Sequence, residues 1–129
     1  MPLVRIDLNR AAPPDRAHII GDVVYAALRA AANVPENDKF QIITRHEAGE
    51  IVAPEAGYLG VTYTDDLVMI QITWNAGRSV EIKRALYRQI ADGIAARAGI
   101  RREDVVINLV EVVKENWSFG NGAMQYAPA

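Results

Sequence analysis

The chain has 129 residues, half of them hydrophobic, and this length suits one domain that buries a core without help from a metal or disulfides. A formal net charge of −2 argues against nucleic acid as a partner, and the absence of cysteine excludes disulfides and thiolate zinc sites. No apolar run approaches the ~20 residues of a membrane span and no signal-peptide pattern opens the chain, so we expect a cytoplasmic protein without a membrane segment.

The first half of the chain reads as strand, helix and strand. Residues 2–8 form the first predicted strand, and the Pro-Pro-Asp sequence at 13–15 begins a helix, because proline and an acid suit the first helical turn. Apolar residues then recur at helical spacing until residues 33–35 end the helix. A second strand is predicted over residues 40–44. Residues 47–63 hold three glycines and one proline, so we expect a loop with room for a short edge hairpin.

The second half repeats this order. Residues 67–74 are the clearest strand, because β-branched and large apolar residues dominate them. Ser79 is a good N-cap for a second helix, and Gly99 is the residue type that commonly follows a helix end. A fourth strand is predicted over residues 105–113, and the tail, residues 114–129, carries aromatic residues among glycines.

The two halves match without a gap at an offset of 66 residues. Asn9 falls on Asn75 and Asp38 falls on Asp104, and the predicted helix starts coincide as well. Identical residues are few, so the evidence is the matching pattern of elements rather than a shared ancestral sequence.

We therefore predict one α/β (α+β) domain over residues 1–129, with pseudo-repeats at 2–64 and 66–113 followed by the tail. Two right-handed β-α-β units give a four-stranded mixed sheet with both helices on one face. The strand at 67–74 has apolar groups in both of its alternating sets, which suits a strand covered on both sides. Because two helices cover only one face, we expect an oligomer that buries the other face.

Pro2 has the most distinctive chemistry, because it becomes the amino terminus once Met1 is removed. Its nitrogen is then a secondary amine, and a free α-amino group has a pKa of about 7.7–8.0. A modest change of surroundings makes such a group a base or an acid at neutral pH. The alternative is that Pro2 only tolerates processing and begins an edge strand, where its missing N–H costs nothing.

Pro2 at the start of a β-α-β repeat without cysteine resembles the tautomerase superfamily, and the fused-repeat branch that contains malonate semialdehyde decarboxylase fits best. Segments similar to that branch's motifs occur in the same order at residues 34–40, 77–79 and 116–122, and the W-S-F-G-x-G pattern of the tail is the most specific of them. The resemblance covers nearly the whole chain. It implies a homotrimeric isomerase or decarboxylase (lyase) that acts on a small oxo acid without a metal or organic cofactor.

The resemblance also implies roles for single residues. Pro2 matches the proline that acts as general acid or base, Asp38 matches an active-site aspartate, and Arg78 matches an arginine that binds the substrate carboxylate. The decarboxylase pattern has a second arginine two residues before that one, where this chain has Ala76, and this departure leaves the substrate open. Asp38 has an alternative reading as turn or cap chemistry, because Asp104 occupies the equivalent turn of the second repeat.

Physical chemistry supports the substrate-binding positions unequally. Arg78 precedes a helix start, where a cation opposes the helix dipole by ~0.3–1 kcal/mol. It is better explained beside an anion held by the amides of Ser79 and Val80, although a solvated surface arginine is the alternative. Trp117 and Phe119 are usual core anchors for a tail, but the resemblance implies an apolar wall near the terminal proline.

Two chemistries follow from where charge is placed. An amine walled by apolar groups loses hydration, its pKa falls, and it can remove a proton next to a carbonyl, which gives keto–enol tautomerisation of a 2-oxo acid. An amine close to Asp38 keeps its proton and can polarise the carbonyl of a 3-oxo acid, which assists loss of carbon dioxide. Asp38 favours the second reaction and Ala76 weakens that preference.

A non-catalytic trimeric ligand-binding or signalling module of the same fold is the alternative function, because a fold does not determine function. No metal site is expected, because the two histidines, His18 and His46, lack metal-ligand spacing.

Overall fold

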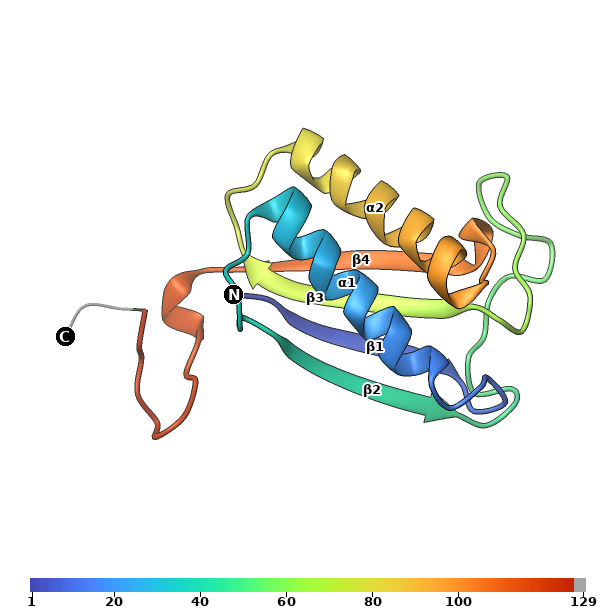
Figure 1. The fold of residues 1–129 in the computed structure, drawn as a ribbon, viewed down its shortest axis with the longest axis horizontal. Coiled ribbons are helices and arrows are strands. Elements are labelled where there is room, and N and C mark those ends of the chain that lie inside the picture. Colours follow the sequence, from blue (N-terminus) through green and yellow to red (C-terminus); the bar gives the residue numbers. More distant parts are fainter. Residues whose placement is uncertain (127–129) are drawn as a thin grey trace.

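A computed structural model of the chain describes residues 1–126 and shows a four-stranded sheet with two helices (Figure 1). The elements are β1 (Leu3–Asn9), α1 (Arg16–Ala32), β2 (Phe40–His46), β3 (Val68–Asn75), α2 (Val80–Ala98) and β4 (Val105–Val112), with short 3-10 turns at Arg102–Asp104 and Lys114–Asn116. The strand order is β2-β1-β3-β4. Within residues 1–126, no helix has both the length and the hydrophobicity that crossing a membrane requires.

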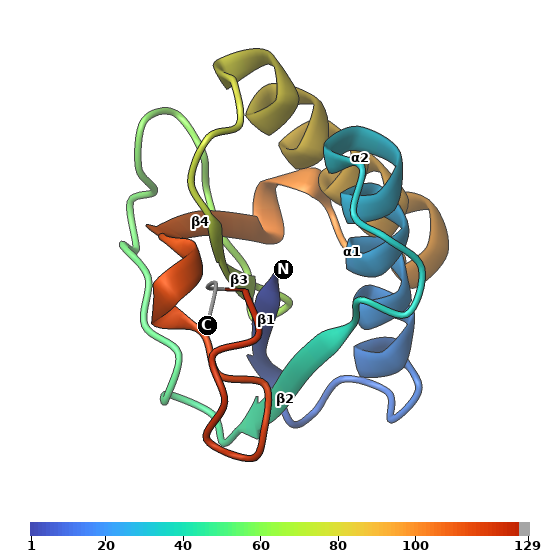
Figure 2. The same cartoon turned by 90° about the vertical axis from the view of Figure 1, so that its left-hand side faces the viewer.

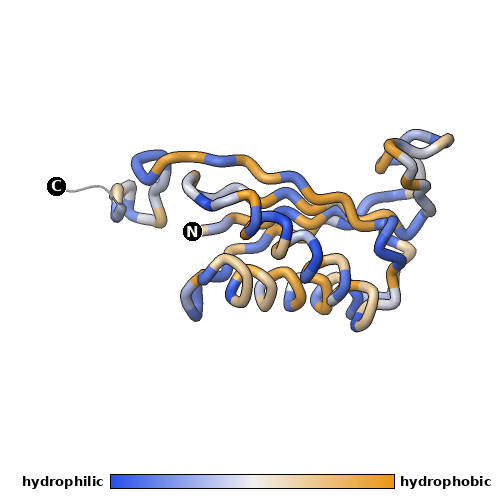
Figure 3. The backbone as a smooth tube through the Cα atoms, turned by 90° about the horizontal axis from the view of Figure 1, so that it is seen from above, coloured by the Kyte–Doolittle hydropathy of each residue, from blue (hydrophilic) through white to orange (hydrophobic). Residues whose placement is uncertain are grey.

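The predicted mixed sheet with both helices on one face is confirmed. β1 pairs with β2 and β3 pairs with β4 in parallel, whereas β1 and β3 are antiparallel. Figure 3 shows both helices on the same side of the sheet. The second strand runs two residues further than predicted, to His46. The edge hairpin for which residues 47–63 left room is reduced to one isolated antiparallel bridge between Tyr58 and Val61.

The two β-α-β units are built alike. Each element of the second unit ends 66 residues after its counterpart in the first unit. The last residues of the paired elements are Asn9 and Asn75, Ala32 and Ala98, and His46 and Val112. Both helices stop at a residue in the left-handed conformation, which is Asn33 (φ 56°) after α1 and Gly99 (φ 69°) after α2. Asparagine and glycine tolerate this conformation best, so the local sequence sets both helix ends.

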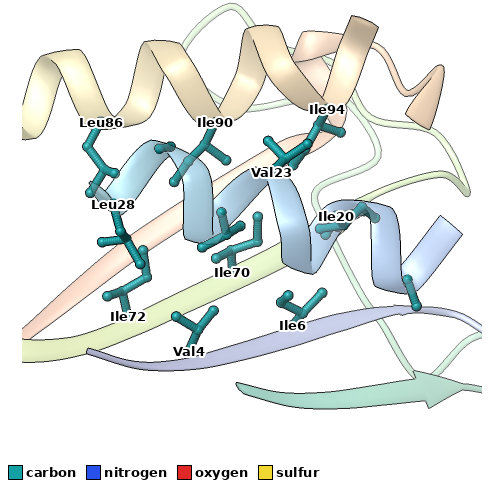
Figure 4. Packing of buried hydrophobic residues seen from close by; sticks show 14 of the residues in the cluster. Val4, Ile6, Ile20, Val23, Leu28, Ile70, Ile72, Leu86, Ile90 and Ile94 are labelled. Atoms are coloured by element: carbon teal, nitrogen blue, oxygen red, sulfur yellow. The ribbon is translucent and has the colours of Figure 1, made fainter. Parts of the chain in front are cut away.

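The core lies between the helices and one face of the sheet (Figure 4). Side chains alternate along the central strands, so every second residue of β1 and β3 points to the helices. The largest fully buried members of this layer are Val4, Ile6, Leu8, Ile20, Leu28, Ile70, Ile72, Trp74, Leu86, Ile90, Ile94 and Ile100. Burial of each such aliphatic side chain stabilises the fold by about 1.5–3 kcal/mol before the entropy of ordering is subtracted.

The opposite face of the sheet carries no helix within residues 1–126, and it is less apolar than the sequence suggests. Phe40 (45% exposed), Ile42 (40%) and Val110 (37%) lie on its outer strands. Its centre contains polar groups, among them Gln71, whose side-chain amide donates to Asn108 at 3.3 Å. The set of β3 residues that faces away from the helices therefore becomes polar after Met69.

The topology gathers several chain segments at one end of the sheet. The starts of β1 and β2 lie there with the ends of β3 and β4, because β1 and β3 are antiparallel. The loop after α1, the turn before α2 and the C-terminal tail reach the same end, which Figure 2 views directly. All the residues predicted for the site lie on these segments.

Candidate active site

The site begins with the amino terminus and one carboxylate. Met1 carries the terminal amine in this structure, and its nitrogen lies 3.9 Å from Oδ2 of Asp38. Both side chains are largely enclosed, with 13% of Met1 and 10% of Asp38 exposed. Pro2 is buried directly before β1. The structure thus places the Met1 amine, one residue before Pro2, beside Asp38.

Hydrogen bonds of the backbone hold the turn that carries Asp38. The Asn37 backbone N–H donates to the hydroxyl of Tyr25 at 3.0 Å, and the Asp38 N–H donates to the carbonyl of Pro35 at 3.2 Å. Asn37 has a φ of 68°, a left-handed conformation that asparagine adopts more readily than most residues. These contacts direct the Asp38 carboxylate towards the start of β1.

The Asp38 carboxyl group has unused hydrogen-bonding capacity. Its Oδ1 is buried and has no hydrogen-bond partner among residues 1–126. Burial raises the pKa of Asp38 above its ordinary value, although the positive charges of the terminal amine and Arg78 oppose the rise. A buried acceptor without a partner is costly, so this oxygen is suited to a ligand or a proton.

Loss of hydration has the largest effect on the pKa of the terminal amine. Burial lowers the pKa of the Met1 amine below its ordinary value of 8.0, while the Asp38 charge opposes this and the Arg78 charge adds to it. The sequence favours a raised pKa at this place because of Asp38. The structure gives the opposite direction for this amine, because desolvation outweighs the carboxylate.

Arg78 lies in the turn between β3 and α2 and is held from two sides. Its Nη1 donates to the backbone carbonyl of Asn75 at 2.9 Å, and its guanidinium carbon lies 4.2 Å from the centre of the buried Trp74 ring. Burial lowers the pKa of Arg78, and the charges of Glu111 and Asp38 raise it. A guanidinium keeps its charge under these conditions, so a fixed cation faces the carboxylate and the amine.

Ser79 is the N-cap of α2, as predicted. Its hydroxyl accepts a hydrogen bond from the Ile82 N–H at 3.2 Å. The first amides of a helix have no intrahelical partners, and Val80 supplies one of them. Binding of a substrate anion to the Ser79 and Val80 amides stays a prediction.

The C-terminal tail brings an aromatic cluster to this end of the sheet. Trp117 stacks on Phe119 with ring centres 5.4 Å apart. The ring centres of Phe119 and Phe40, the first residue of β2, are 5.9 Å apart. Tyr126 meets the Phe119 ring edge-on at 5.1 Å. The last tail residues of the prediction, 127–129, lie outside the described residues. The two predicted tail residues, Trp117 and Phe119, are therefore neighbours in one cluster.

Sequence reasoning missed three residues of the site. Burial and the charge of Asp38 raise the pKa of the Tyr126 hydroxyl, with Arg78 opposing, so this phenol lies within electrostatic reach of both groups. Trp74 contacts the Arg78 guanidinium with its ring, and Asn75 accepts a hydrogen bond from it. The sequence signal for Trp74 and Asn75 was their position directly before the arginine turn, whereas only the path of the tail brings Tyr126 to the site.

Asp104, the counterpart of Asp38 in the repeat, has a different environment. It is fully buried and accepts hydrogen bonds from the Thr64 N–H at 2.7 Å, the Thr64 hydroxyl at 2.5 Å and Arg101 Nε at 3.2 Å. Burial pushes the pKa of Asp104 upward, but the hydrogen bonds from Thr64 and Arg101 together lower it below its ordinary value. Asp104 is therefore a satisfied structural group, and the turn-chemistry reading applies to it.

Two further features of the described chain lie away from the amine and Arg78. Within residues 1–126 no three His, Cys, Asp or Glu side chains come together as a metal would require. His46 instead pairs with Asp7 at 2.6 Å at the far end of the sheet. A cavity of about 340 Å³ also lies at that far end, between Asn9 and the loop at 47–67, away from the amine and Arg78.

Comparisons with known proteins agree on one family. A family model described as "Tautomerase enzyme" matches residues 38–120. The probable tautomerase YusQ of Bacillus subtilis (strain 168) is 38% identical over 125 residues, which are 97% of this chain and 98% of that protein. The probable tautomerase YrdN of the same strain is 31% identical, with 98% of this chain and 96% of that protein covered.

Solved structures show the same relationship. The FG41 malonate semialdehyde decarboxylase inhibited by 3-bromopropiolate is 35% identical, with a TM-score of 0.89 over 96% of this chain and 93% of that chain. A fused 4-OT wild-type symmetric trimer has a TM-score of 0.76 at 21% identity, over 94% of each chain, which shows a shared fold.

The contrast between Asp38 and Asp104 predicts opposite effects on stability. Asp104→Ala leaves the Thr64 N–H and hydroxyl unsatisfied, so the free energy of unfolding should fall by roughly 1–3 kcal/mol at pH 7. The Asp104 pKa is lower in the folded state than its ordinary value of 3.8, so this stabilisation is complete above that pH and fades as pH falls through the folded pKa. The difference between wild type and variant should narrow in acid.

Asp38→Ala is the matched control. Its pKa is raised in the folded state, so its ionised form is disfavoured there, and its removal should leave the free energy of unfolding unchanged or slightly higher. Urea titrations of both variants measure these effects. An equal loss of stability in the two variants would show that Asp38 is a structural group like Asp104.

Proposed function

Because the chain belongs to the tautomerase superfamily, in its malonate semialdehyde decarboxylase-like branch, we propose that it is an enzyme whose amino-terminal Pro2 acts on a small oxo acid in the cytoplasm. One observation supports this proposal: the partly buried Met1 amine, one residue before Pro2, lies 3.9 Å from the Asp38 carboxyl, whose Oδ1 has no partner among residues 1–126, and within electrostatic reach of the Arg78 cation. The three groups supply an acid–base centre and an anion site. The chemistry they offer needs no metal or organic cofactor.

The proposal requires that Met1 is removed. While Met1 is present, the Pro2 ring nitrogen is part of a peptide bond and is not basic. Removal of one residue moves the terminal nitrogen by about 3.3–3.6 Å along the extended chain, to the buried start of β1. The new secondary amine then stays enclosed beside the turn that carries Asp38.

Burial lowers the pKa of the Met1 amine, and the same loss of hydration at the Pro2 amine would favour proton abstraction. A neutral amine can remove a proton from the carbon next to the carbonyl of a 2-oxo acid while Arg78 holds the carboxylate. The electron pair of the broken C–H bond moves to the carbonyl oxygen, which then takes up a proton to give the enol. Asp38 is suited to hydrogen-bond that oxygen, because burial raises its pKa and Oδ1 has no protein partner among residues 1–126. Keto–enol tautomerisation is thus the first candidate reaction.

Decarboxylation of a 3-oxo acid is the second candidate, and the proximity of Asp38 to the amine supports it. A protonated amine polarises the carbonyl, the carbon–carbon bond to the carboxylate breaks, and the electron pair forms an enolate as carbon dioxide leaves. The similarity to malonate semialdehyde decarboxylase favours the same chemistry. Ala76 leaves one arginine at this turn, so a substrate with a single carboxylate suits the site better than one with two.

The pH dependence of catalysis should separate the two reactions. If the neutral amine is the active form, kcat/KM for phenylenolpyruvate rises as pH passes the amine pKa; if the protonated amine is active, kcat/KM for malonate semialdehyde falls there. The charge of Asp38 raises the amine pKa, so Asp38→Asn should move the rising or falling limb of the pH–rate profile to lower pH.

Mass spectrometry should find Met1 absent from the active protein, and Pro2→Ala should reduce activity. An unmoved limb, or full activity after acetylation of the amino terminus, would contradict the proline mechanism.

Arg78→Ala should weaken binding of the substrate carboxylate. Loss of one charge-assisted pair costs about 1.5–3 kcal/mol, which corresponds to a 10- to 150-fold fall in kcat/KM. Stability should change by less than about 1 kcal/mol, because the lost contact with Trp74 is offset by removal of a cation from a helix start. Arg84→Ala, on the exposed surface of α2, is the control and should leave kinetics unchanged. Unchanged kinetics in Arg78→Ala with a large loss of stability would make Arg78 a structural residue.

We also propose that the protein is a homotrimer. The helix-free sheet face exposes Phe40, Ile42 and Val110, and trimeric proteins of the same fold are known. Sedimentation velocity at micromolar concentration should give the trimer mass for wild type. Ile42→Asp should give monomer, because a buried charge without a partner is costly, whereas Tyr87→Asp on α2 should stay trimeric. A stable wild-type monomer is the result that rejects this assembly.

A further inference from the structure

Asn75 makes two hydrogen bonds that join separate parts of the site. Its backbone carbonyl accepts from Arg78 Nη1 at 2.9 Å, and its side-chain Oδ1 accepts from Trp117 Nε1 at 2.8 Å. It is the last residue of β3, where pairing with Val112 and the hydrogen bond from Ala76 N–H to the Val112 carbonyl (2.8 Å) hold the backbone. A rigid strand end thus contacts both the arginine turn and the tail.

The bond to Trp117 is the polar connection between the tail and the sheet. Among the hydrogen bonds within residues 1–126, it is the one that joins residues 117–126 to the sheet, since the others in this segment are internal or go to residue 114. An aromatic pair, Phe119 and Phe40, also joins the tail to the sheet. An indole N–H only donates, so its partner must be an acceptor such as the Asn75 amide oxygen.

Asn9, the equivalent residue of the first repeat, shows that this use is specific. Its side-chain oxygen accepts from the Ala11 N–H at 2.9 Å, a local bond that stabilises its own turn. Asn75 has the same place in the second repeat, but its side chain binds a residue 42 positions away. The asparagine of the first repeat therefore makes a local turn contact, and its counterpart in the second repeat makes a long-range tether.

We propose that Asn75 is a positioning residue, which holds Arg78 and the aromatic tail in one arrangement around the terminal amine. The backbone carbonyl of Asn75 and the Trp74 ring together restrict the guanidinium. The side chain of Asn75 restrains Trp117, which stacks on Phe119 and so restrains the aromatic cluster. The catalytic part of this inference rests on the proposed function, whereas the tether can be tested without it.

The tether is tested by hydrogen exchange of the tail and by tryptophan fluorescence. One neutral hydrogen bond contributes about 0.5–1.5 kcal/mol, so Asn75→Ala should speed amide exchange in residues 117–126 by about 2- to 12-fold. The emission of Trp117 should move to longer wavelength as the ring meets water; Trp74, the other tryptophan, stays buried. Asn75→Asp keeps an acceptor oxygen and should retain slow exchange. Asn9→Ala, the matched control, should leave the tail unchanged.

Trp117→Phe provides the second arm, because it removes the N–H and keeps a ring for Phe119. It should speed exchange in residues 118–126 about as much as Asn75→Ala does, and the double variant should be no faster than either single one. This arm also decides the matter if Asn75→Ala does not fold. Additive effects, or tail exchange that Asn75→Ala and Trp117→Phe leave unchanged, would overturn the tether.

Kinetics test the positioning role. Asn75→Ala keeps the backbone carbonyl that accepts from Arg78 and removes only the side-chain bond to Trp117. With an oxo acid that wild type converts, loss of the tail's position should therefore raise KM several-fold more than it lowers kcat, and Asn75→Asp, which keeps the acceptor, should recover most of the loss. A fall in kcat with unchanged KM, or no recovery in Asn75→Asp, would overturn it. If wild type converts no oxo acid, the proposed function fails, and the exchange data still decide whether the tether exists.

Discussion

The antiparallel pairing of β1 with β3 decides where every group of the site lies. In this register Leu3 stands opposite Thr73, five residues before Arg78, so the amino terminus lies next to the last residues of β3. A parallel arrangement would separate the amine from that turn by the full length of a strand, roughly 20 Å. The parallel partners β2 and β4 then bring the turn that carries Asp38 and the tail to the same end.

At that end, hydration and charge act on the amine in opposite directions. Asp38 attracts its proton, whereas burial and Arg78 disfavour the charged form, and burial has the largest effect. The same burial raises the pKa of Asp38. Burial therefore favours the neutral forms of both the Met1 amine and Asp38, which is the direction that the proposed proton transfer requires. The positive charge of Arg78, which lies near both groups, is favoured by the charges of Glu111 and Asp38.

The internal repeat allows a comparison that a single site does not. Asp104 and Asp38 occupy equivalent turns, yet Asp104 has Thr64 and Arg101 as partners, whereas one oxygen of Asp38 has none among the described residues. Asn9 and Asn75 differ in the same way, one bonded within its own turn and the other to the tail. In both pairs the side chain at the amine's end of the sheet makes no hydrogen bond within its own turn among the described residues.

The sequence by itself determined the elements and most residues of the site, because helix caps, alternation and turns depend on neighbours in the chain. Ser79 as N-cap and Gly99 after α2 are examples, and the family resemblance pointed to Pro2, Asp38 and Arg78. Only the tertiary structure decided the direction of the amine pKa, since burial depends on how distant segments enclose it. It alone brought Asn75 to Trp117 and Tyr126 to the charged pair, because contacts between residues far apart in the chain have no local pattern.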